Sequence, residues 1–598
     1  MINWFKWLVL SVLTLLLLTA LGLYTSLRLS LPALDGNSAT YHVNAPTELS
    51  RDELGQAVIK ANDIFDAAYA LGFAHAQDRF FQMDLQRRAA SGSLSQWVGD
   101  IALDVDKKAR FHQFGKRAKV VFDNLPSKQQ ELLVRYAHGV NDALSEYTLP
   151  PFEYLAAGVD IKQWRPTDSI LVIYSMYLDL QGSQVELDLA REALLSTFGD
   201  DLYSFITQPS NYQAALDASE IPLLESPIPE YPASLRPITH SPEDSNGESI
   251  KQEPEDATTQ YSNDSDNTAI ARAQYNGTEL PDIGSNNWAV TGSHTTTSAG
   301  LLANDMHLGL RVPIIWYRAQ LNYQESGSDV QVTGVSLPGI PGIVVGTNGH
   351  IAWGFTNANL DNVDWIELGE STATNTVTER IPLPDGEHTF EFEVSSYGPV
   401  KELNGKRYAL NWVAHHPFAA NLGIINFGNA KNVQAAIKMG QRIAIPTQNL
   451  VIVDESGNAA WLPGGAVMER QQASFTAIKE QEAVNTPPKR ASKLPMVLNP
   501  DMGRIWTANA RVISADDFKV WGDGGYALGA RGQQIRDRLF EKDTFTETDF
   551  YAIQLDNHAR FLIPWQHLLY GLLNMQDIEF KPDLAYLNTW DECACEDS

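Results

Sequence analysis

The spacing of apolar residues divides the chain into a helical first part and a strand-rich second part. The clearest helical pattern runs from Asp66 to Gly92, where apolar side chains recur three and four positions apart. Its apolar positions include Ala70, Phe73, Phe80 and Met83. This spacing places one face of an α-helix against a core. Similar patterns alternate with short polar breaks from about Val43 to Pro222, so we expect mainly helices there.

Three arginines fall within this helical pattern. We expect Arg79 to form a buried ion pair with its neighbour Asp78. We expect Arg87 and Arg88 to lie on a solvated face of the same helix, because a charged side chain is seldom buried unless it is paired.

After Ser285 the apolar residues fall into short β-rich runs separated by Gly, Asn and Pro. These runs are NNWAVTG, GLLAND, DVQVTGVSLPG, GIVVGTNGHIAWGFT and QNLVIVDESGNAAWLPGG. Short runs with such punctuation are typical of antiparallel strands. Helices followed by strands predict an α+β fold.

Residues 225–284 lie between the two parts and have a different composition. The stretch SPEDSNGESIKQEPEDATTQYSNDSDN has hardly an apolar side chain. Such a sequence buries too little surface to offset its chain entropy. We expect an acidic linker or a spacer that is removed.

The N-terminus carries a long apolar run, Trp7 to Leu27, between Lys6 and Arg28. Its length is close to the ~20 residues that span a bilayer as a helix. Residues 1–35 are therefore interpreted as a secretion signal or an uncleaved membrane anchor. No clean A-x-A cleavage site follows, which favours the anchor. Lys6 then lies on the cytoplasmic side, and the rest of the chain is periplasmic or otherwise extracytoplasmic.

Composition narrows the classes of function. The 598 residues are 44% hydrophobic, which is ample for a large core, and the formal net charge is −29. A surface this acidic repels nucleic acid, so we expect no nucleic-acid partner. We interpret Cys593 and Cys595 as incidental thiols, because a zinc site needs four ligands.

Ser285 stands at the junction between the spacer and the strand-rich part. One interpretation is that it simply begins a strand. Alternatively, scission before Ser285 would free an α-amine with a pKa of about 7.7–8.0, suited to act as a base at neutral pH. A serine hydroxyl needs such a base to become a nucleophile. Gly284 leaves the preceding backbone free to adopt strained geometries.

Five sequence blocks resemble the penicillin acylase family of N-terminal-nucleophile hydrolases. They are ALGFAHAQDRFFQMDLQRRAASGSLSQWVG, GSNNWAV, GTNGHIAWGFTNANLDNVDWIEL, TQNLVIVDESGN and TANARV. The resemblance extends from about residue 44 to the end of the chain. It implies a four-layer αββα sandwich, with two antiparallel sheets between helical layers. It also implies a precursor that matures into a heterodimer of a first chain, 36–224, and a second chain, 285–598.

The resemblance implies roles for individual residues. Ser285 aligns with the nucleophile, and the Gly284–Ser285 bond aligns with the cleavage site. The oxyanion hole would use the backbone N–H of Asn357 and the side chain of Asn509. Two preorganised donors of this kind can supply several kcal/mol of transition-state stabilisation.

Two further positions align with residues near the family's active site. His307 would hold and tune the α-amine of Ser285 through hydrogen bonds. Arg531 falls on a family arginine, and a purely structural salt bridge is an equally good interpretation of it.

The resemblance also implies an acyl pocket. Its lining would consist of Met176, Leu180, Met306, Leu308, Val345 and Phe355. All six are apolar, so the pocket favours an aliphatic or aromatic acyl group over a charged one. A plain core role is the alternative for each.

A structural calcium ion is the cofactor that the resemblance implies. Its ligands would be Glu186 from the first chain, Asp361, Asp364 and the carbonyl of Val363. Oxygen ligands of this kind suit calcium. Val520 replaces a further ligand aspartate, for which Asp523 is the nearest substitute, and Met468 replaces a proline.

We therefore expect an amidohydrolase that acts on a linear acyl amide. An acylated homoserine lactone, an N-acyl amino acid and a β-lactam side-chain amide all remain open as substrates. One alternative is a catalytically inactive, membrane-tethered binding protein on the same scaffold, and another is a serine hydrolase that uses Ser285 in an uncut chain. Members of the family usually continue further, so we expect the second chain to be truncated at its C-terminus.

Overall fold

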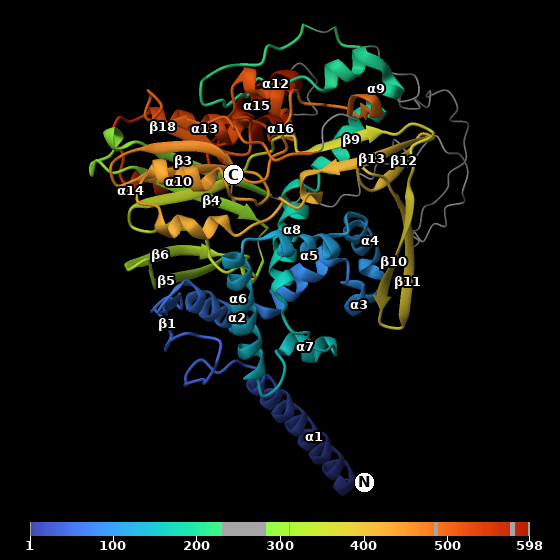
Figure 1. Ribbon diagram of the computed structural model, residues 1–598, viewed down its shortest axis with the longest axis vertical. Coiled ribbons are helices and arrows are strands. Elements are labelled where there is room, and N and C mark those ends of the chain that lie inside the picture. The colour runs from blue at the N-terminus through green and yellow to red at the C-terminus, as the bar shows by residue number, and fades with distance from the viewer. Residues whose placement is uncertain are drawn as a thin grey trace.

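The computed structural model describes residues 2–225, 227–229, 283–309, 311–483, 488–574 and 581–595 (Figure 1). The predicted spacer, 225–284, lies almost entirely outside the described residues. The apolar N-terminal run forms helix α1 (Ile2–Leu29), and Figure 1 shows it projecting from the body of the protein. Residues Trp4–Leu29 of this helix are long and apolar enough to cross a membrane, and none of that stretch is buried.

The first part of the chain is helical, as its periodicity predicts. After a strand pair, β1 (Glu48–Arg51) and β2 (Ala57–Lys60), it forms α2 (Ile64–Ser91), α3 (Ser95–Val98), α4 (Leu103–His112), α5 (Phe114–Asn124), α6 (Ser127–Ser145), α7 (Phe152–Ala157), α8 (Pro166–Gln181) and α9 (Gln184–Ile206). Helix α2 begins after the Asp63 cap and ends at Gly92, which has a φ of 65°. Gly72 and Gly139 let α2 and α6 touch, because a Cβ at either position would lie within 2.3 Å of a carbonyl oxygen on the other helix.

The arginines of α2 do not lie as predicted. Arg87 and Arg88 are buried, and the side-chain nitrogen Nε of each donates to Asp84, at 2.6 and 3.2 Å. Arg79 instead donates to a backbone carbonyl, and Asp78 pairs with Arg51 from strand β1 at 2.8 Å. The expected solvated face and the expected Arg79 pair were wrong, because other segments cover the end of α2 and supply the partners.

The largest sheet has nine strands in the order β1-β2-β5-β6-β7-β8-β14-β15-β17. Its strands from the second part are β5 (Tyr317–Glu325), β6 (Ser328–Ser336), β7 (Ile343–Thr347), β8 (Ile351–Asn357), β14 (Gln448–Asp454), β15 (Ala459–Gly464) and β17 (Val497–Leu498). Every neighbouring pair is antiparallel except β2 with β5. The first part of the chain therefore extends this sheet by two strands.

A second sheet of three strands, in the order β18-β3-β4, carries Ser285. It contains β3 (Ile283–Val290), β4 (Leu301–Leu308) and β18 (Arg504–Thr507). Strands β3 and β4 pack on β8 of the large sheet, while α13 (Ala530–Phe540) and α14 (Glu547–Gln554) cover the other face. Helix α2 covers the outer face of the large sheet at β2 and β5. Figure 1 shows the same layering, which confirms the predicted αββα architecture.

A lateral unit was not predicted from the sequence. It combines a four-stranded sheet, β12-β13-β9-β16, with a long hairpin, β10-β11 (Figure 1). The strands are β9 (Val363–Glu367), β10 (Asn375–Leu383), β11 (Gly386–Val394), β12 (Val400–Leu403), β13 (Lys406–Trp412) and β16 (Ile478–Lys479). The remaining helices are α10 (Val433–Gly440), α11 (Glu480–Ala483), α12 (Ala515–Trp521), α15 (Ile563–Asn574) and α16 (Lys581–Thr589).

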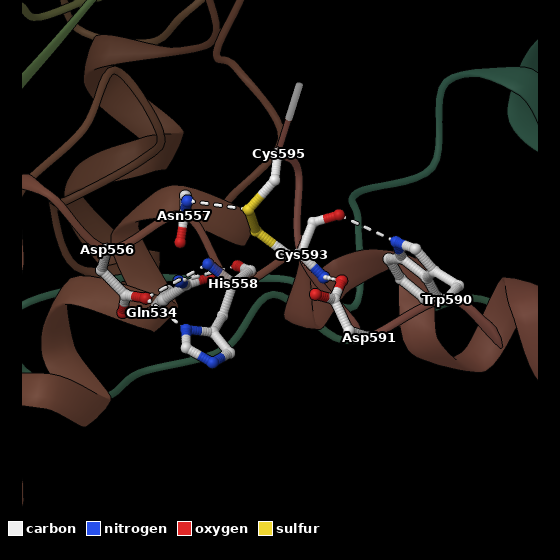
Figure 2. Close-up of a disulfide and its surroundings, with 8 residues drawn as sticks. All are labelled: Gln534, Asp556, Asn557, His558, Trp590, Asp591, Cys593 and Cys595. Atoms are coloured by element: carbon white, nitrogen blue, oxygen red, sulfur yellow. Dashed lines mark hydrogen bonds and ion pairs between the residues drawn. A yellow bond between two sulfur atoms is a disulfide. The ribbon is translucent and has the colours of Figure 1, made fainter. Parts of the chain in front are cut away.

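The two cysteines form a disulfide, so their interpretation as incidental thiols was wrong. Figure 2 shows the Cys593–Cys595 bond close to Asn557, whose side-chain amide lies 3.1 Å from the Cys595 sulfur. The Trp590 indole donates to the carbonyl of Cys593 at 2.8 Å. A bridge between His558 and Cys593 connects this tight loop to the segment after α14.

Candidate active site

Ser285 lies inside a strand rather than in a flexible loop. In the register of β3 with β4, Gly284 faces His307, Ser285 faces Met306 and Asn286 faces Asp305. Strand β18 pairs with the other edge of β3. The Ser285 residue is only 6% exposed. The serine and the bond before it are therefore held by β4, whereas β18 pairs with β3 only from Asn287 to Val290.

Asn509 holds the backbone nitrogen of Ser285. The Ser285 N–H donates to Asn509 Oδ1 at 2.6 Å, and Asn509 Nδ2 donates to the carbonyl of Asn357 at 3.2 Å. Asn509 has a φ of 65°, a left-handed conformation that asparagine tolerates better than most residues. The structure thus brings both predicted oxyanion-hole residues together at Ser285. One hydrogen of the Asn509 amide remains for a further acceptor.

Arg531, near the start of α13, binds three oxygens around Ser285. Its Nη1 donates to the Ser285 carbonyl at 3.0 Å and to Asn286 Oδ1 at 2.6 Å, and its Nη2 donates to Asn509 Oδ1 at 3.1 Å. This contact set favours the active-site interpretation of Arg531 over a remote structural salt bridge. A positive charge at this position also favours the neutral form of an amine at Ser285 over the ammonium form.

His307 lies on β4, directly opposite Gly284 of β3. A Cβ built on Gly284 would lie 3.3 Å from His307 Nδ1 and 3.0 Å from Arg531 Nη2. The other ring nitrogen, Nε2, lies 2.8 Å from Asp305 Oδ2. The hydrogen bond to His307 is the main reason that the pKa of Asp305 is lowered, so the carboxylate is charged at neutral pH. Only a residue without a side chain fits at position 284 without displacing these groups.

Ser285 also lines an apolar cavity of about 780 Å³, measured with its open mouth. Five of the six predicted pocket residues line it: Met176, Leu180, Met306, Leu308 and Phe355. The sixth, Val345, does not, and its neighbour Val344 does. Neighbouring residues of a strand face opposite sides, so an alignment error of one position exchanges them.

Several lining residues were missed, and all of them except Gln448 lie outside the matched motifs. They are Ile173, Trp316, Leu337, Ile340, Val344, Asn421, Leu422, Ile424, Ile445, Pro446 and Gln448. Apart from Asn421 and Gln448 they are apolar like any core residue, and only the packing of α8 against the sheets brings them into one wall. Asp305 was missed because it lies outside the matched blocks, whereas Asn286 was missed as a site residue although it lies within one.

The predicted calcium ligands do not form a calcium site as they stand. Arg470 bonds to Asp361 Oδ2, and its Nη2 lies 3.2 Å from both the Val363 carbonyl and Asp364 Oδ1. A guanidinium therefore holds the three oxygens that the ion would need. Glu186 lies apart, 61% exposed at its side chain, and pairs with Lys401 at 2.6 Å. Among the described residues, no group of three or more His, Cys, Asp or Glu side chains is arranged to hold a metal.

A different carboxylate from the first part of the chain lies near this cluster. Burial raises the pKa of Asp188, and the nearby charge of Asp361 adds to the effect. Burial raises the pKa of Asp361 and of Asp364 too, although Arg470 opposes the shift in both. Asp523, the suggested substitute ligand, instead pairs with Arg191 at 3.0 Å. The structure thus shows an ion-pair cluster around Arg470 and supports no catalytic step through a metal.

Comparison with known proteins gives a consistent result. The sequence model of the penicillin amidase family matches residues 46–598. The acyl-homoserine lactone acylase QuiP of Pseudomonas aeruginosa is 29% identical over 56% of this chain and 36% of its own length. The penicillin acylase 2 proenzyme of Pseudomonas sp. strain SE83 is 27% identical over 93% of this chain and 69% of its own. Penicillin G acylase of Escherichia coli is 25% identical over 74% of this chain and 55% of its own length.

The chain thus spans between 36 and 69% of the length of these relatives. A solved structure, thermostable penicillin G acylase from Alcaligenes faecalis, aligns with a TM-score of 0.43 and 20% identity over 52% of this chain and 59% of that one. The resemblance read from the sequence motifs is confirmed by the family match, which extends from the start of the helical part to the last residue. The chain therefore belongs to the penicillin amidase family.

Proposed function

We propose that the chain is a self-processing acylase that hydrolyses a linear amide with a hydrophobic acyl group. One observation carries this proposal. Ser285 lines an apolar cavity, while its backbone nitrogen is bonded to an asparagine that also has a free amide hydrogen near the same position. This arrangement supports Ser285 as the nucleophile, and Asn509 as the residue that binds its amine and donates to the oxyanion, at the mouth of an acyl pocket.

Maturation would begin at the Gly284–Ser285 bond. The Ser285 hydroxyl attacks the Gly284 carbonyl carbon, the C–N bond breaks, and the nitrogen takes up a proton. Water then hydrolyses the resulting ester and leaves Ser285 with a free amine. The bonds of Asn509 to the Ser285 nitrogen and of Arg531 to the Ser285 carbonyl hold both sides of this residue during the change.

Turnover would use the freed amine as the base. It accepts the proton of the Ser285 hydroxyl as the oxygen attacks the substrate carbonyl. The second Asn509 amide hydrogen and the Asn357 backbone N–H stabilise the oxyanion, a contribution of about 3–4 kcal/mol per donor in comparable sites. The amine product leaves with the proton, and water releases the acid from the acyl-enzyme.

The substrate proposal stops at the acyl group. The cavity is lined almost entirely by aliphatic side chains with Trp316 and Phe355, so it suits an aliphatic or aromatic acyl chain. Relatives named as acyl-homoserine lactone acylases and penicillin acylases support a linear amide in general. The candidates are an acylated homoserine lactone, an N-acyl amino acid and a β-lactam side-chain amide.

The mature protein would be a heterodimer outside the cytoplasmic membrane. Helix α1 would act as a secretion signal or as an inner-membrane tether. The segment after it is bonded to the body of the protein, since Thr40 and His42 both contact Asp142 at 2.9 and 3.0 Å. A retained α1 would therefore hold the body close to the membrane.

Expression of the wild-type chain and of Ser285→Ala tests the proposal. Intact mass and N-terminal sequencing should find a second chain that begins at Ser285 in the wild type and a single uncut chain in the variant. Ser293→Ala, a change at a serine of the turn after β3, should mature normally. Octanoyl-homoserine lactone, N-octanoylglycine and penicillin G then serve as substrates, with the released amine as readout. An uncut chain that hydrolyses amides contradicts the mechanism, and an uncut chain inactive on every amide supports the binding-protein alternative.

A further inference from the structure

Asp305 and His307 form a carboxylate–imidazole pair on one strand. They are two positions apart on β4, so their side chains leave the same face of the sheet. His307 Nε2 lies 2.8 Å from Asp305 Oδ2. The chemistry of such a pair does not depend on the family match, because it follows from a carboxylate and an imidazole at this spacing on one strand.

The pair fixes where the imidazole proton resides. An ionised carboxylate only accepts hydrogen bonds, so the hydrogen of a neutral His307 ring must be on Nε2. Nδ1 is then left with a lone pair. This nitrogen is the one that faces Gly284, at 3.3 Å from a Cβ built there. Scission of the bond after Gly284 would vacate this space next to the new amine of Ser285.

Asp305 is itself held in place. Asn286 Nδ2 lies 3.4 Å from Asp305 Oδ2, and the other end of the same amide, Oδ1, accepts from Arg531 at 2.6 Å. A continuous set of hydrogen bonds thus runs from Arg531 through Asn286 and Asp305 to His307. This series of hydrogen bonds explains why an asparagine is suited to position 286, next to Ser285: its amide both donates to Asp305 and accepts from Arg531.

We propose that Asp305 is a positioning residue that presents His307 Nδ1 as an acceptor to the Ser285 amine. This inference rests on the proposed function. A neutral primary amine has two hydrogens and one lone pair. Asn509 Oδ1 accepts one hydrogen and His307 Nδ1 accepts the other, directly or through a water molecule in the vacated space. Only the lone pair of the amine nitrogen is then left without a partner, and it is directed to the Ser285 hydroxyl, whose proton it can accept.

Asp305→Asn reverses this arrangement. The new amide can donate to Nε2, which moves the ring hydrogen to Nδ1. Nδ1 then donates to the amine lone pair and competes with the hydroxyl. We expect kcat to fall at least tenfold, with KM changed less than twofold because the acyl cavity is untouched. Asp556→Asn is the matched control, since Asp556 and His558 have the same spacing and lie 3.0 Å apart outside the site. This control should retain wild-type kcat and KM.

A second readout separates the inference from the proposed function. Histidine side-chain ¹⁵N NMR on the uncut Ser285→Ala protein should show His307 with hydrogen on Nε2, and on Ser285→Ala/Asp305→Asn with hydrogen on Nδ1. This reading needs no activity. A tautomer that does not change, or a mature Asp305→Asn enzyme with wild-type kcat, overturns the inference. The expected tautomers in a protein without any amidase activity would instead overturn the proposed function and leave the pair standing.

Discussion

The length of the acyl chain should control the rate of hydrolysis in a quantitative way. The cavity at Ser285 is lined almost entirely by apolar side chains, so an acyl chain that enters it leaves water. Each methylene transferred from water into an apolar environment contributes about 0.8 kcal/mol. An octanoyl group has four methylenes more than a butanoyl group, so it gains about 3 kcal/mol. That gain corresponds to roughly a 200-fold higher kcat/KM.

The assay compares amides of one amine with acyl groups from butanoyl to octanoyl and measures the released amine. Val344→Thr places a hydroxyl in the cavity wall with little change in volume. Covering that hydroxyl with an acyl chain should cost about 1–2 kcal/mol, which lowers kcat/KM for the octanoyl substrate roughly tenfold. Val345→Thr is the matched control, because the neighbouring residue does not line the cavity. It should leave the octanoyl rate within about twofold of the wild type.

Two results would refute this reasoning. The first is a kcat/KM that rises less than about fivefold from butanoyl to octanoyl, since an apolar cavity that accepts the chain must reward its length. The second is an equal loss in both threonine variants, which would show that the effect is general destabilisation rather than contact with the acyl chain.

The remaining predictions concern stability, measured by urea denaturation or thermal unfolding. Asp84→Ala should lower the free energy of unfolding by about 3–5 kcal/mol, because it leaves the buried Arg88 without its carboxylate and the buried Arg87 with Asp168 alone. Asp104→Ala, at a 91% exposed side chain, should change it by less than about 0.5 kcal/mol. Burial lowers the pKa of His75 from 6.5 to about 3, so the unfolded chain binds a proton that the folded protein does not. This group should therefore lower the free energy of unfolding by about 1.4 kcal/mol for each unit by which the pH falls from 6.5 to 3. His75→Gln should reduce the slope of the free energy of unfolding against pH by that amount. An unchanged slope contradicts the assignment. EDTA should leave the wild-type Tm unchanged, and a Tm that falls on chelation would restore the calcium prediction. Arg470→Met should lower the free energy of unfolding by about 3–5 kcal/mol, because it leaves the buried Asp361 and Asp364 without their cation.

Prediction from the sequence succeeded where a local pattern is sufficient. The helix around residues 66–92 formed as α2, because an apolar stripe, an aspartate cap and a terminal glycine all act within the segment. The strands after Ser285 also formed as predicted, because the short β-rich runs and the Gly, Asn and Pro residues between them likewise act within a segment. Burial of Arg87 was missed, since the carbonyls of residues 162 and 163 and its partner Asp168, in the first turn of α8, come from a segment 75 to 81 positions away.

The candidate site shows the same division. Motif matching assigned Ser285, Asn509 and Arg531 to one site, and the structure brings them into contact. Ser285 is more than two hundred positions from the other two in the sequence. It did not distinguish Val344 from Val345, because that choice depends on which face of β7 meets the cavity. It also gave Glu186 a role as a ligand, whereas the first turn of α9 directs Glu186 to the surface.

The sequence by itself determined the order of helices and strands, the position of Ser285 at the start of the strand-rich part and the apolar character of several residues around it. These depend on local periodicity and on residue types that physics requires at a given position. Only the tertiary structure decided which charges are buried together, which oxygens Arg470 holds and which nitrogen of His307 faces the bond before Ser285. Such features depend on contacts between segments distant in the sequence, and the energy of a buried charge or hydrogen bond is set by those contacts rather than by the residue alone.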